Sequence, residues 1–121
     1  MFESAEQKAI VAWFRATYPE YAMCLRVSQS GGYRGAGRTG AIRTAQVNAM
    51  GGITGEADIA ILLKRGGFGC LIIEHKAEGS QHTTTKAQLE YIQRHNSCGN
   101  LAIVTRGVGA CTAAIKQYMA L

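Results

Sequence analysis

The sequence lacks several features that mark whole classes of proteins. No apolar stretch approaches the ~20 residues that a membrane-spanning helix needs, so we expect no membrane partner. The opening segment, Met1 to Ser4, has neither a basic region nor an apolar one, and we therefore expect no secretory signal and a cytoplasmic protein. The four cysteines show no C-x-x-C spacing, which argues against a zinc site and favours reduced thiols.

Acidic residues are scarce and unevenly distributed. The formal net charge is +5, and no Asp or Glu lies between Tyr21 and Gly55. The same stretch contains Arg34, Arg38 and Arg43 and eight of the fifteen glycines. A basic segment of small residues suits a polyanion whose backbone must come close, and we expect these arginines to contact nucleic-acid phosphates. The plainer alternative is a solvated loop without a role.

The only aspartate, Asp58, interrupts the first of two apolar, strand-like runs, residues 57–63 and 69–76. The glycine-containing segment between them is typical of a hairpin connection. If the turn is centred on Gly66, residue i faces residue 132 − i, which places Asp58 directly across from Glu74. We therefore expect two carboxylates to meet at the end of an otherwise apolar hairpin.

Side chains alternate along a strand, so Glu74 and Lys76 share one face and His75 points to the other. Two carboxylates this close repel each other unless one is protonated or a cation intervenes. A hard divalent cation such as Mg²⁺ prefers oxygen ligands and keeps waters for a substrate, and a neighbouring lysine can place an attacking water. Phosphodiester hydrolysis needs these parts. The alternative is that Asp58 caps a strand end while Glu74 and Lys76 form a surface ion pair.

Length and periodicity predict one domain over residues 1–121, of α/β class, with a mixed sheet and helices on its faces. The expected order is helix, strand, loop or helix, strand, strand, helix, strand, helix. The first helix is expected to be capped by Ser4 and to end before Pro19. Its periodicity turns Glu6 toward the buried side, where it could serve as a third acidic group, with Glu3 as the alternative. Favourable interaction with the helix N-terminus explains both residues equally well.

These residues together resemble the PD-(D/E)xK nuclease superfamily, and within it the VRR-NUC family of virus-type replication-repair nucleases. The likeness covers almost the whole chain. Its motifs are Glu6-Gln7 in the first helix, Gly55-Glu56-Ala57-Asp58, Ile73-Glu74-His75-Lys76, Gln88, and a closing pattern from Gly107 to Tyr118. The second motif more often has valine and proline before the aspartate, and the third an apolar residue before the lysine.

The resemblance implies that Asp58 and Glu74 bind Mg²⁺ or Mn²⁺, with the backbone carbonyl of His75 as a further ligand and Glu6 completing the acidic cluster. It also implies that Lys76 orients or activates the attacking water. Gln88 would position the lysine or a phosphate. No small-molecule cofactor is implied.

Free-standing members of the family are commonly phage-encoded homodimers that cleave branched DNA such as four-way (Holliday) junctions. The resemblance therefore implies a Mg²⁺-dependent DNA endonuclease with a repair-type substrate, acting as a homodimer in a bacterial or phage-infected cell. Two alternatives remain: a catalytically silent nucleic-acid-binding module with the same fold, and the nuclease of a restriction system.

Overall fold

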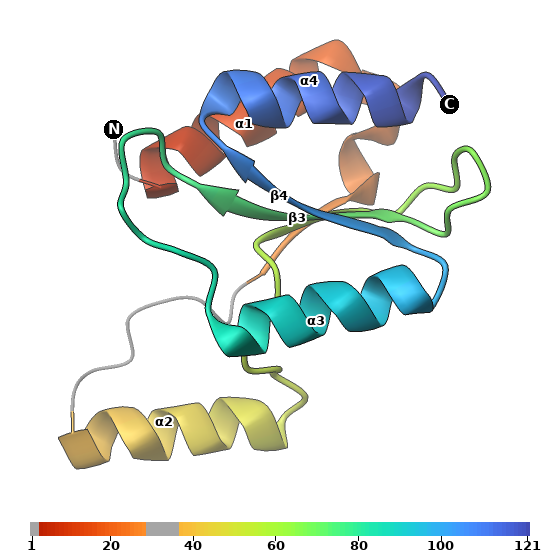
Figure 1. Ribbon diagram of the computed structural model, residues 1–121. Helices are drawn as coiled ribbons and strands as arrows, with labels where there is room; N and C mark the ends of the chain where they lie inside the picture. Colours follow the sequence, from red (N-terminus) through yellow and green to blue (C-terminus); the bar gives the residue numbers. More distant parts are fainter. Residues whose placement is uncertain (1–2, 29–36) are drawn as a thin grey trace.

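The computed structural model describes residues 3–28 and 37–121, and its elements follow the expected order (Figure 1). They are α1 (Glu3–Thr17), the 3₁₀ helix η1 (Pro19–Cys24), β1 (Leu25–Val27), α2 (Gly37–Ala49), β2 (Ile59–Ile61), β3 (Leu71–Lys76), α3 (Lys86–Ser97), β4 (Leu101–Arg106) and α4 (Val108–Met119).

The four strands form one mixed sheet in the order β1-β2-β3-β4. The β1–β2 and β2–β3 pairs are antiparallel and the β3–β4 pair is parallel. Strand β3 lies between two neighbours, and all six of its residues are buried. Two parallel neighbouring strands need a crossover connection, and the segment that contains α3 provides it between β3 and β4.

The predicted register of the β2–β3 pair is confirmed, although the turn is centred between Gly66 and Gly67 rather than on Gly66. Ile59 pairs with Ile73, and Ile61 pairs with Leu71, so each pair of residue numbers adds up to 132. At the tip, Arg65 and Phe68 exchange backbone hydrogen bonds of 3.2 and 2.8 Å around a two-residue turn. The turn residues Gly66 and Gly67 both have positive φ, at 57° and 87°, which a primed hairpin turn demands.

Helices cover both faces of the sheet, with α1 and α4 on one side and α3 on the other (Figure 1). On the α1/α4 side the core includes Ile10, Phe14 and Ile73. A smaller cluster on the α3 side contains Ile72 and Ile92. Because consecutive β3 residues face opposite layers, the two faces of this one strand belong to two different cores.

Some local expectations were wrong. Helix α1 already begins at Glu3, so Ser4 lies within it rather than capping it. The expected first strand is short, because Pro19 at the first position of η1 favours a tight helical turn and β1 begins only at Leu25. Where either a loop or a helix was expected, residues 37–49 of the basic segment form a helix of 13 residues, α2.

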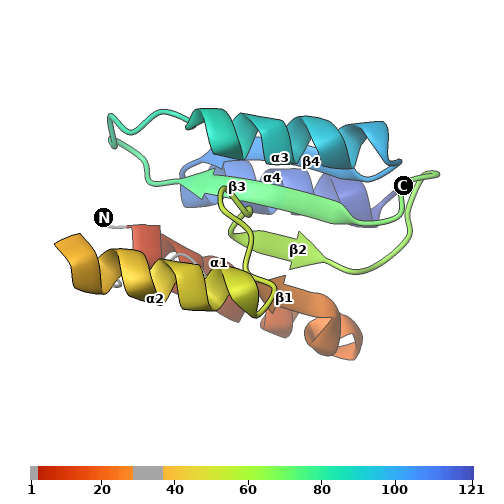
Figure 2. The ribbon, with the colours of Figure 1, turned by 90° about the horizontal axis from the view of Figure 1, so that it is seen from below.

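Helix α2 stands away from the sheet on the side of α3, displaced toward β1 (Figure 2). Its residues are largely exposed, and Gly40 is its one buried residue. Within the described ranges, no helix is long and apolar enough to cross a membrane.

We predict that Gly55→Ala destabilises the fold more than Gly51→Ala does. Both glycines have positive φ, at 84° and 105°, so an alanine at either is strained by about 1–2 kcal/mol. A Cβ at Gly55 would also lie 2.5 Å from the Ala87 backbone in α3, whereas one at Gly51 meets nothing within 4 Å. That clash adds roughly 1–3 kcal/mol.

Urea unfolding of the two variants measures the difference. Equal losses of unfolding free energy in the two variants would show that the close approach of Gly55 to α3 does not constrain the backbone before Asp58.

Candidate active site

A cavity of about 440 Å³ opens beside the end of the β2–β3 ladder, between α2 and α3. Its wall combines charged groups from β3 and the chain before β2 with polar groups from both helices. The lining residues are Thr44, Asn48, Ile53, Thr54, Gly55, Glu56, Asp58, Glu74, Lys76, His82, Thr83, Thr85 and Gln88. The structure therefore brings four of the expected site residues together: Asp58, Glu74, Lys76 and Gln88.

Asp58 is held in place immediately before β2. Its backbone carbonyl accepts a 2.8 Å hydrogen bond from the Ser28 amide at the end of β1. Its carboxylate oxygen Oδ2 accepts a 2.9 Å hydrogen bond from the backbone amide of His75. The register of the β2–β3 pair places Asp58 opposite Glu74. Through its side chain, Asp58 thus extends the pairing of the two strands by one more hydrogen bond.

Glu74 is buried, with only 2% of its surface exposed. Its Oε2 contacts the Lys76 ammonium and accepts from the side-chain amide of Gln88, each at 3.2 Å, while its Oε1 has no hydrogen-bond donor within residues 3–28 and 37–121. Burial, and then the charge of Asp58, raise the pKa of Glu74 to about 7, although Lys76 pulls it down. A buried carboxylate with one unpaired oxygen is costly unless something charged or polar meets it.

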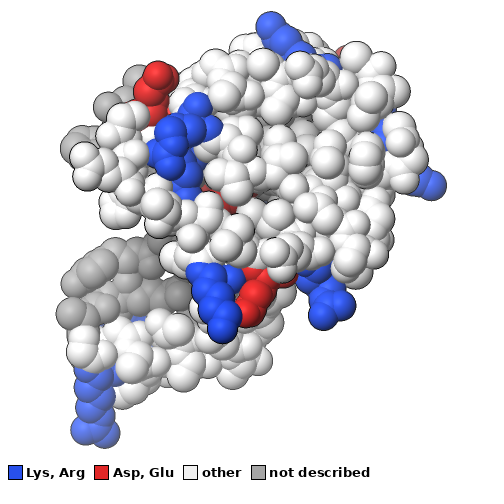
Figure 3. All heavy atoms as spheres, in the orientation of Figure 1, with Lys and Arg blue, Asp and Glu red and all other residues white. Residues whose placement is uncertain are grey.

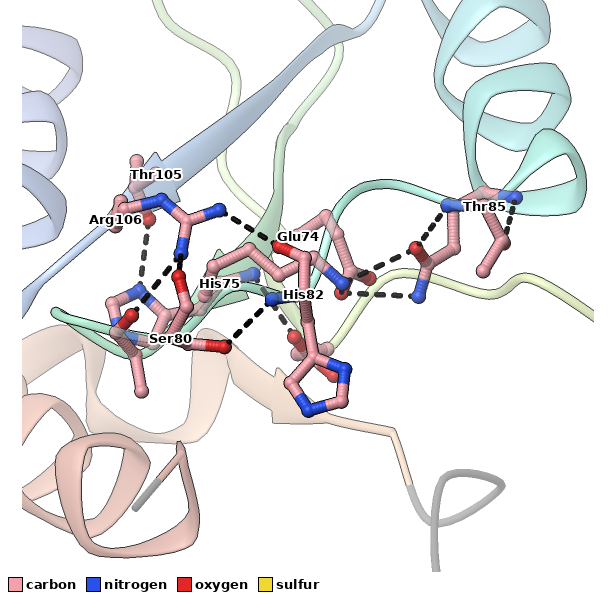
Figure 4. Close-up of polar contacts among 11 residues, drawn as sticks. Glu74, His75, Ser80, His82, Thr85, Thr105 and Arg106 are labelled. Atoms are coloured by element: carbon pink, nitrogen blue, oxygen red, sulfur yellow. Dashed lines mark hydrogen bonds and ion pairs between the residues drawn. The ribbon is translucent and has the colours of Figure 1, made fainter. Parts of the chain in front are cut away.

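Lys76 and Glu74 are joined to the first turn of α3 by Gln88. The side-chain oxygen Oε1 of Gln88 accepts from Lys76 Nζ at 3.2 Å and from the backbone amide of Thr85 at 2.9 Å. In return, Thr85 Oγ1 accepts from the backbone amide of Gln88 at 3.1 Å (Figure 4). Thr85 and Gln88 thereby form a capping box that begins α3. The bonds that start the helix also orient the lysine.

A divalent cation fits this arrangement. The unpaired Glu74 Oε1 and the neighbouring Asp58 carboxylate supply the hard anionic oxygens that Mg²⁺ prefers. The N–H of His75 points toward Asp58, and in a strand the carbonyl of the same residue points to the same neighbour. Across residues 3–28 and 37–121, no three His, Cys, Asp or Glu side chains gather as ligands, so waters and this carbonyl would have to complete the shell.

Glu6 does not join Asp58 and Glu74, which corrects the expectation that it completes their cluster. It is buried on the α1 side of the sheet, where Oε1 lies 2.7 Å from His75 Nε2 and Oε2 accepts a 3.0 Å bond from the Glu78 amide. The hydrogen bond with His75 lowers the pKa of Glu6 against the opposing effect of burial. Periodicity correctly turned Glu6 inward, but α1 lies on the face that His75 occupies. The side chain of Glu3 lies outside what the structure describes.

His75 is a structural residue, as the strand alternation suggested. Its other ring nitrogen, Nδ1, lies 2.9 Å from Thr105 Oγ1, so both nitrogens are occupied in the interior (Figure 4). Because the same residue's backbone amide holds Asp58, the buried ring fixes the strand at the point where the site is built.

The structure describes two of the three arginines that were expected to contact nucleic acid. Arg38 and Arg43 are exposed on α2, and Arg34 lies outside the described residues. At about 100° per residue, Arg38 and Arg43 flank on either side the stripe of α2 that presents Thr44 and Asn48 to the cavity. Basic side chains are spread over this face, including the end of α2, rather than gathered in one stripe (Figure 3).

Several cavity residues were missed by the sequence reasoning. Thr85 was missed, although its spacing from Gln88 is a readable capping signature, T-x-x-Q. Thr44 and Asn48 had no signal, because their position depends on how α2 sits across the cavity. Glu56, which stands where the family more often has valine, lines the cavity and accepts a 2.9 Å bond from the Ser28 hydroxyl.

We predict that Glu6 and His75 are energetically coupled. Glu6→Ala and His75→Ala should each destabilise the protein, and the double variant should lose less than the sum, because either change alone leaves a buried polar partner unpaired. Urea unfolding measures all three, with Glu6→Ala paired with exposed Glu20→Ala as a control expected to be additive. Additive losses for Glu6 and His75 would contradict the pairing.

Comparisons with known proteins bear on the fold. No protein-family model matches the chain, and no curated protein sequence does. Among solved structures, a chain described as "VRR_NUC domain protein" matches with a TM-score of 0.84 and 24% sequence identity, over 100% of this chain and 90% of that chain. The four-stranded mixed sheet flanked by helices is consistent with the restriction-endonuclease-like fold, as expected. The resemblance drawn from the motifs therefore extends to the three-dimensional fold.

Proposed function

We propose that this chain is a Mg²⁺-dependent endonuclease that hydrolyses phosphodiester bonds of DNA. The observation that carries the proposal is the unpaired, buried Oε1 of Glu74 beside Asp58, with an ammonium on the same face. A module that only binds DNA would gain by losing two carboxylates next to a phosphate. The name of the structural neighbour, "VRR_NUC domain protein", agrees with the same class of activity.

Each residue of the site has a role in this chemistry. Asp58 and Glu74 hold Mg²⁺ or Mn²⁺, together with the His75 carbonyl. The ion, when bound, stabilises negative charge on the oxygens around the scissile phosphorus. Lys76 orients the attacking water, and Gln88 keeps the ammonium beside Glu74. Arg38 and Arg43 contact neighbouring phosphates without reading the bases.

We further propose that the enzyme prefers branched DNA and acts as a homodimer. A two-fold pair of small domains would place two sites on two strands of a four-way junction, which one 13.0 kDa chain cannot reach alone. Light scattering on the purified protein with a four-way junction tests this, and a complex containing a single copy would contradict it.

We predict that Mg²⁺-dependent cleavage depends on Asp58 and Lys76. Asp58→Ala and Lys76→Ala should each slow cleavage roughly 100-fold or more, since each removes a group acting at the reacting atoms. Both variants should stay folded and keep much of their DNA binding. The assay is single-turnover digestion, with and without Mg²⁺, of single strand, linear duplex, flap, fork and four-way junction.

The same panel separates the alternatives. Binding without cleavage in Mg²⁺ or Mn²⁺ would favour the silent binding module, and sequence-selective cleavage of linear duplex would favour a restriction nuclease. Cleavage at the full rate by Asp58→Ala would end the proposal.

We predict an opposite response of stability to pH with and without Mg²⁺. The pKa of Glu74 is raised from 4.5 unfolded to about 7 folded, so without metal this group's contribution is fully present below 4.5 and is lost as the pH rises through about 7. The ion competes with the proton, so Mg²⁺ should stabilise the folded protein far more at pH 8 than at pH 5.5. At a Mg²⁺ concentration of 100 times the Kd at pH 8, the stabilisation at that pH should be about 2.7 kcal/mol.

Thermal unfolding in EDTA and in Mg²⁺ from pH 5 to 8 measures both responses. Glu74→Gln should abolish them, and exposed Glu90→Gln should leave them unchanged. A Mg²⁺ effect that is independent of pH, or that survives Glu74→Gln, would contradict the assignment.

A further inference from the structure

The middle of the loop of residues 77–85, which leads from β3 to α3, is bound by the side chain of Arg106. Arg106, at the end of β4, donates hydrogen bonds to the carbonyls of Ala77 at 3.3 Å, Ser80 at 2.7 Å and His82 at 2.9 Å (Figure 4). Ser80 Oγ also accepts a 3.1 Å bond from the His82 amide. A loop without regular secondary structure is thus held in one shape beside the cavity.

His82 is the residue that this arrangement presents. Its backbone amide and carbonyl are both occupied, and the residue lines the same cavity as Asp58, Glu74 and Lys76. The ring itself has no recorded partner among residues 3–28 and 37–121. The other two histidines differ, since the His75 ring is buried between two partners and the His95 ring bonds Asn100 at 3.0 Å.

The other cationic side chain that lines the cavity, Lys76, is already engaged. The Lys76 ammonium bonds Glu74 and Gln88, and the Gln88 amide bonds Glu74. Histidine is the side chain most often used to transfer protons in catalysis, and His82 is exposed enough to exchange protons with water.

We propose that His82 is the general acid that protonates the leaving oxygen in phosphodiester cleavage. This rests on the proposed nuclease function and goes beyond it, because it assigns the second proton transfer of the reaction. The water oxygen bonds to phosphorus, the bond from phosphorus to the bridging sugar oxygen breaks, and its electron pair stays on that oxygen. A proton moves from a His82 ring nitrogen to the sugar oxygen, and the proton lost by water passes to solvent.

Charged groups surround His82 in its loop and in the cavity. The Arg106 guanidinium binds its carbonyl, Lys76 and the carboxylates of Asp58, Glu74 and Glu56 share its cavity, and Glu78 lies four residues before it in the same loop.

A substrate with a sulfur atom in place of the leaving bridging oxygen tests the proposal, because a thiolate leaves without being protonated. His82→Ala should slow single-turnover cleavage of ordinary DNA roughly 100-fold or more, and should cleave the sulfur-containing DNA within a few-fold of the wild-type rate. Since the cleaved bond is to be determined, both the 3′-bridging and the 5′-bridging sulfur substrates are used. Gln81→Ala, a neighbouring exposed residue outside the cavity, should match wild type on all of them.

The possible outcomes are distinct. A rate for His82→Ala equal to wild type on ordinary DNA overturns the general-acid role and leaves the nuclease proposal intact. An equal loss on oxygen and sulfur substrates shows a positioning effect and also overturns it. Absence of wild-type cleavage on every substrate overturns the nuclease proposal, and this inference with it.

Discussion

The carboxylate of Glu74 lies in the protein interior beside Asp58, and the groups around it follow from the need to stabilise its charge. Lys76 offsets that charge from two residues away on the same face, and Gln88 supplies the remaining hydrogen bond. One oxygen is still unpaired, and the pKa stays near 7. We propose that a divalent cation would stabilise a site balanced in this way, and metal-assisted chemistry is therefore the function that we propose for it.

Strand β3 is central to the molecule because one of its faces lines the cavity and the other carries a buried polar network. Glu74 and Lys76 face α3 and the cavity, while His75 faces α1 and is fixed between Glu6 and Thr105. The backbone links the two sides, since the His75 amide holds the Asp58 carboxylate. Burying a polar network under the strand therefore helps fix the geometry of the groups above it.

The parts of this structure that depend on short-range rules could be predicted from the sequence. The pairing of Asp58 with Glu74 follows from a glycine turn and two apolar runs, and alternation then assigns faces to His75 and Lys76. Glu6 could not be placed in the same way, because helical periodicity tells which side is buried but not which face of the sheet the helix covers. The position of α2 across the cavity is likewise a matter of tertiary packing, which no local pattern encodes.

The most direct test of the account is a crystal structure of the protein grown with Mn²⁺, in which anomalous scattering locates the ion. The account predicts one peak or two at the end of the β2–β3 ladder, within coordination distance of the Asp58 carboxylate, Glu74 Oε1 and the carbonyl of His75. An ion bound at Glu6, or no ion at this place under conditions in which the protein is active, would contradict it.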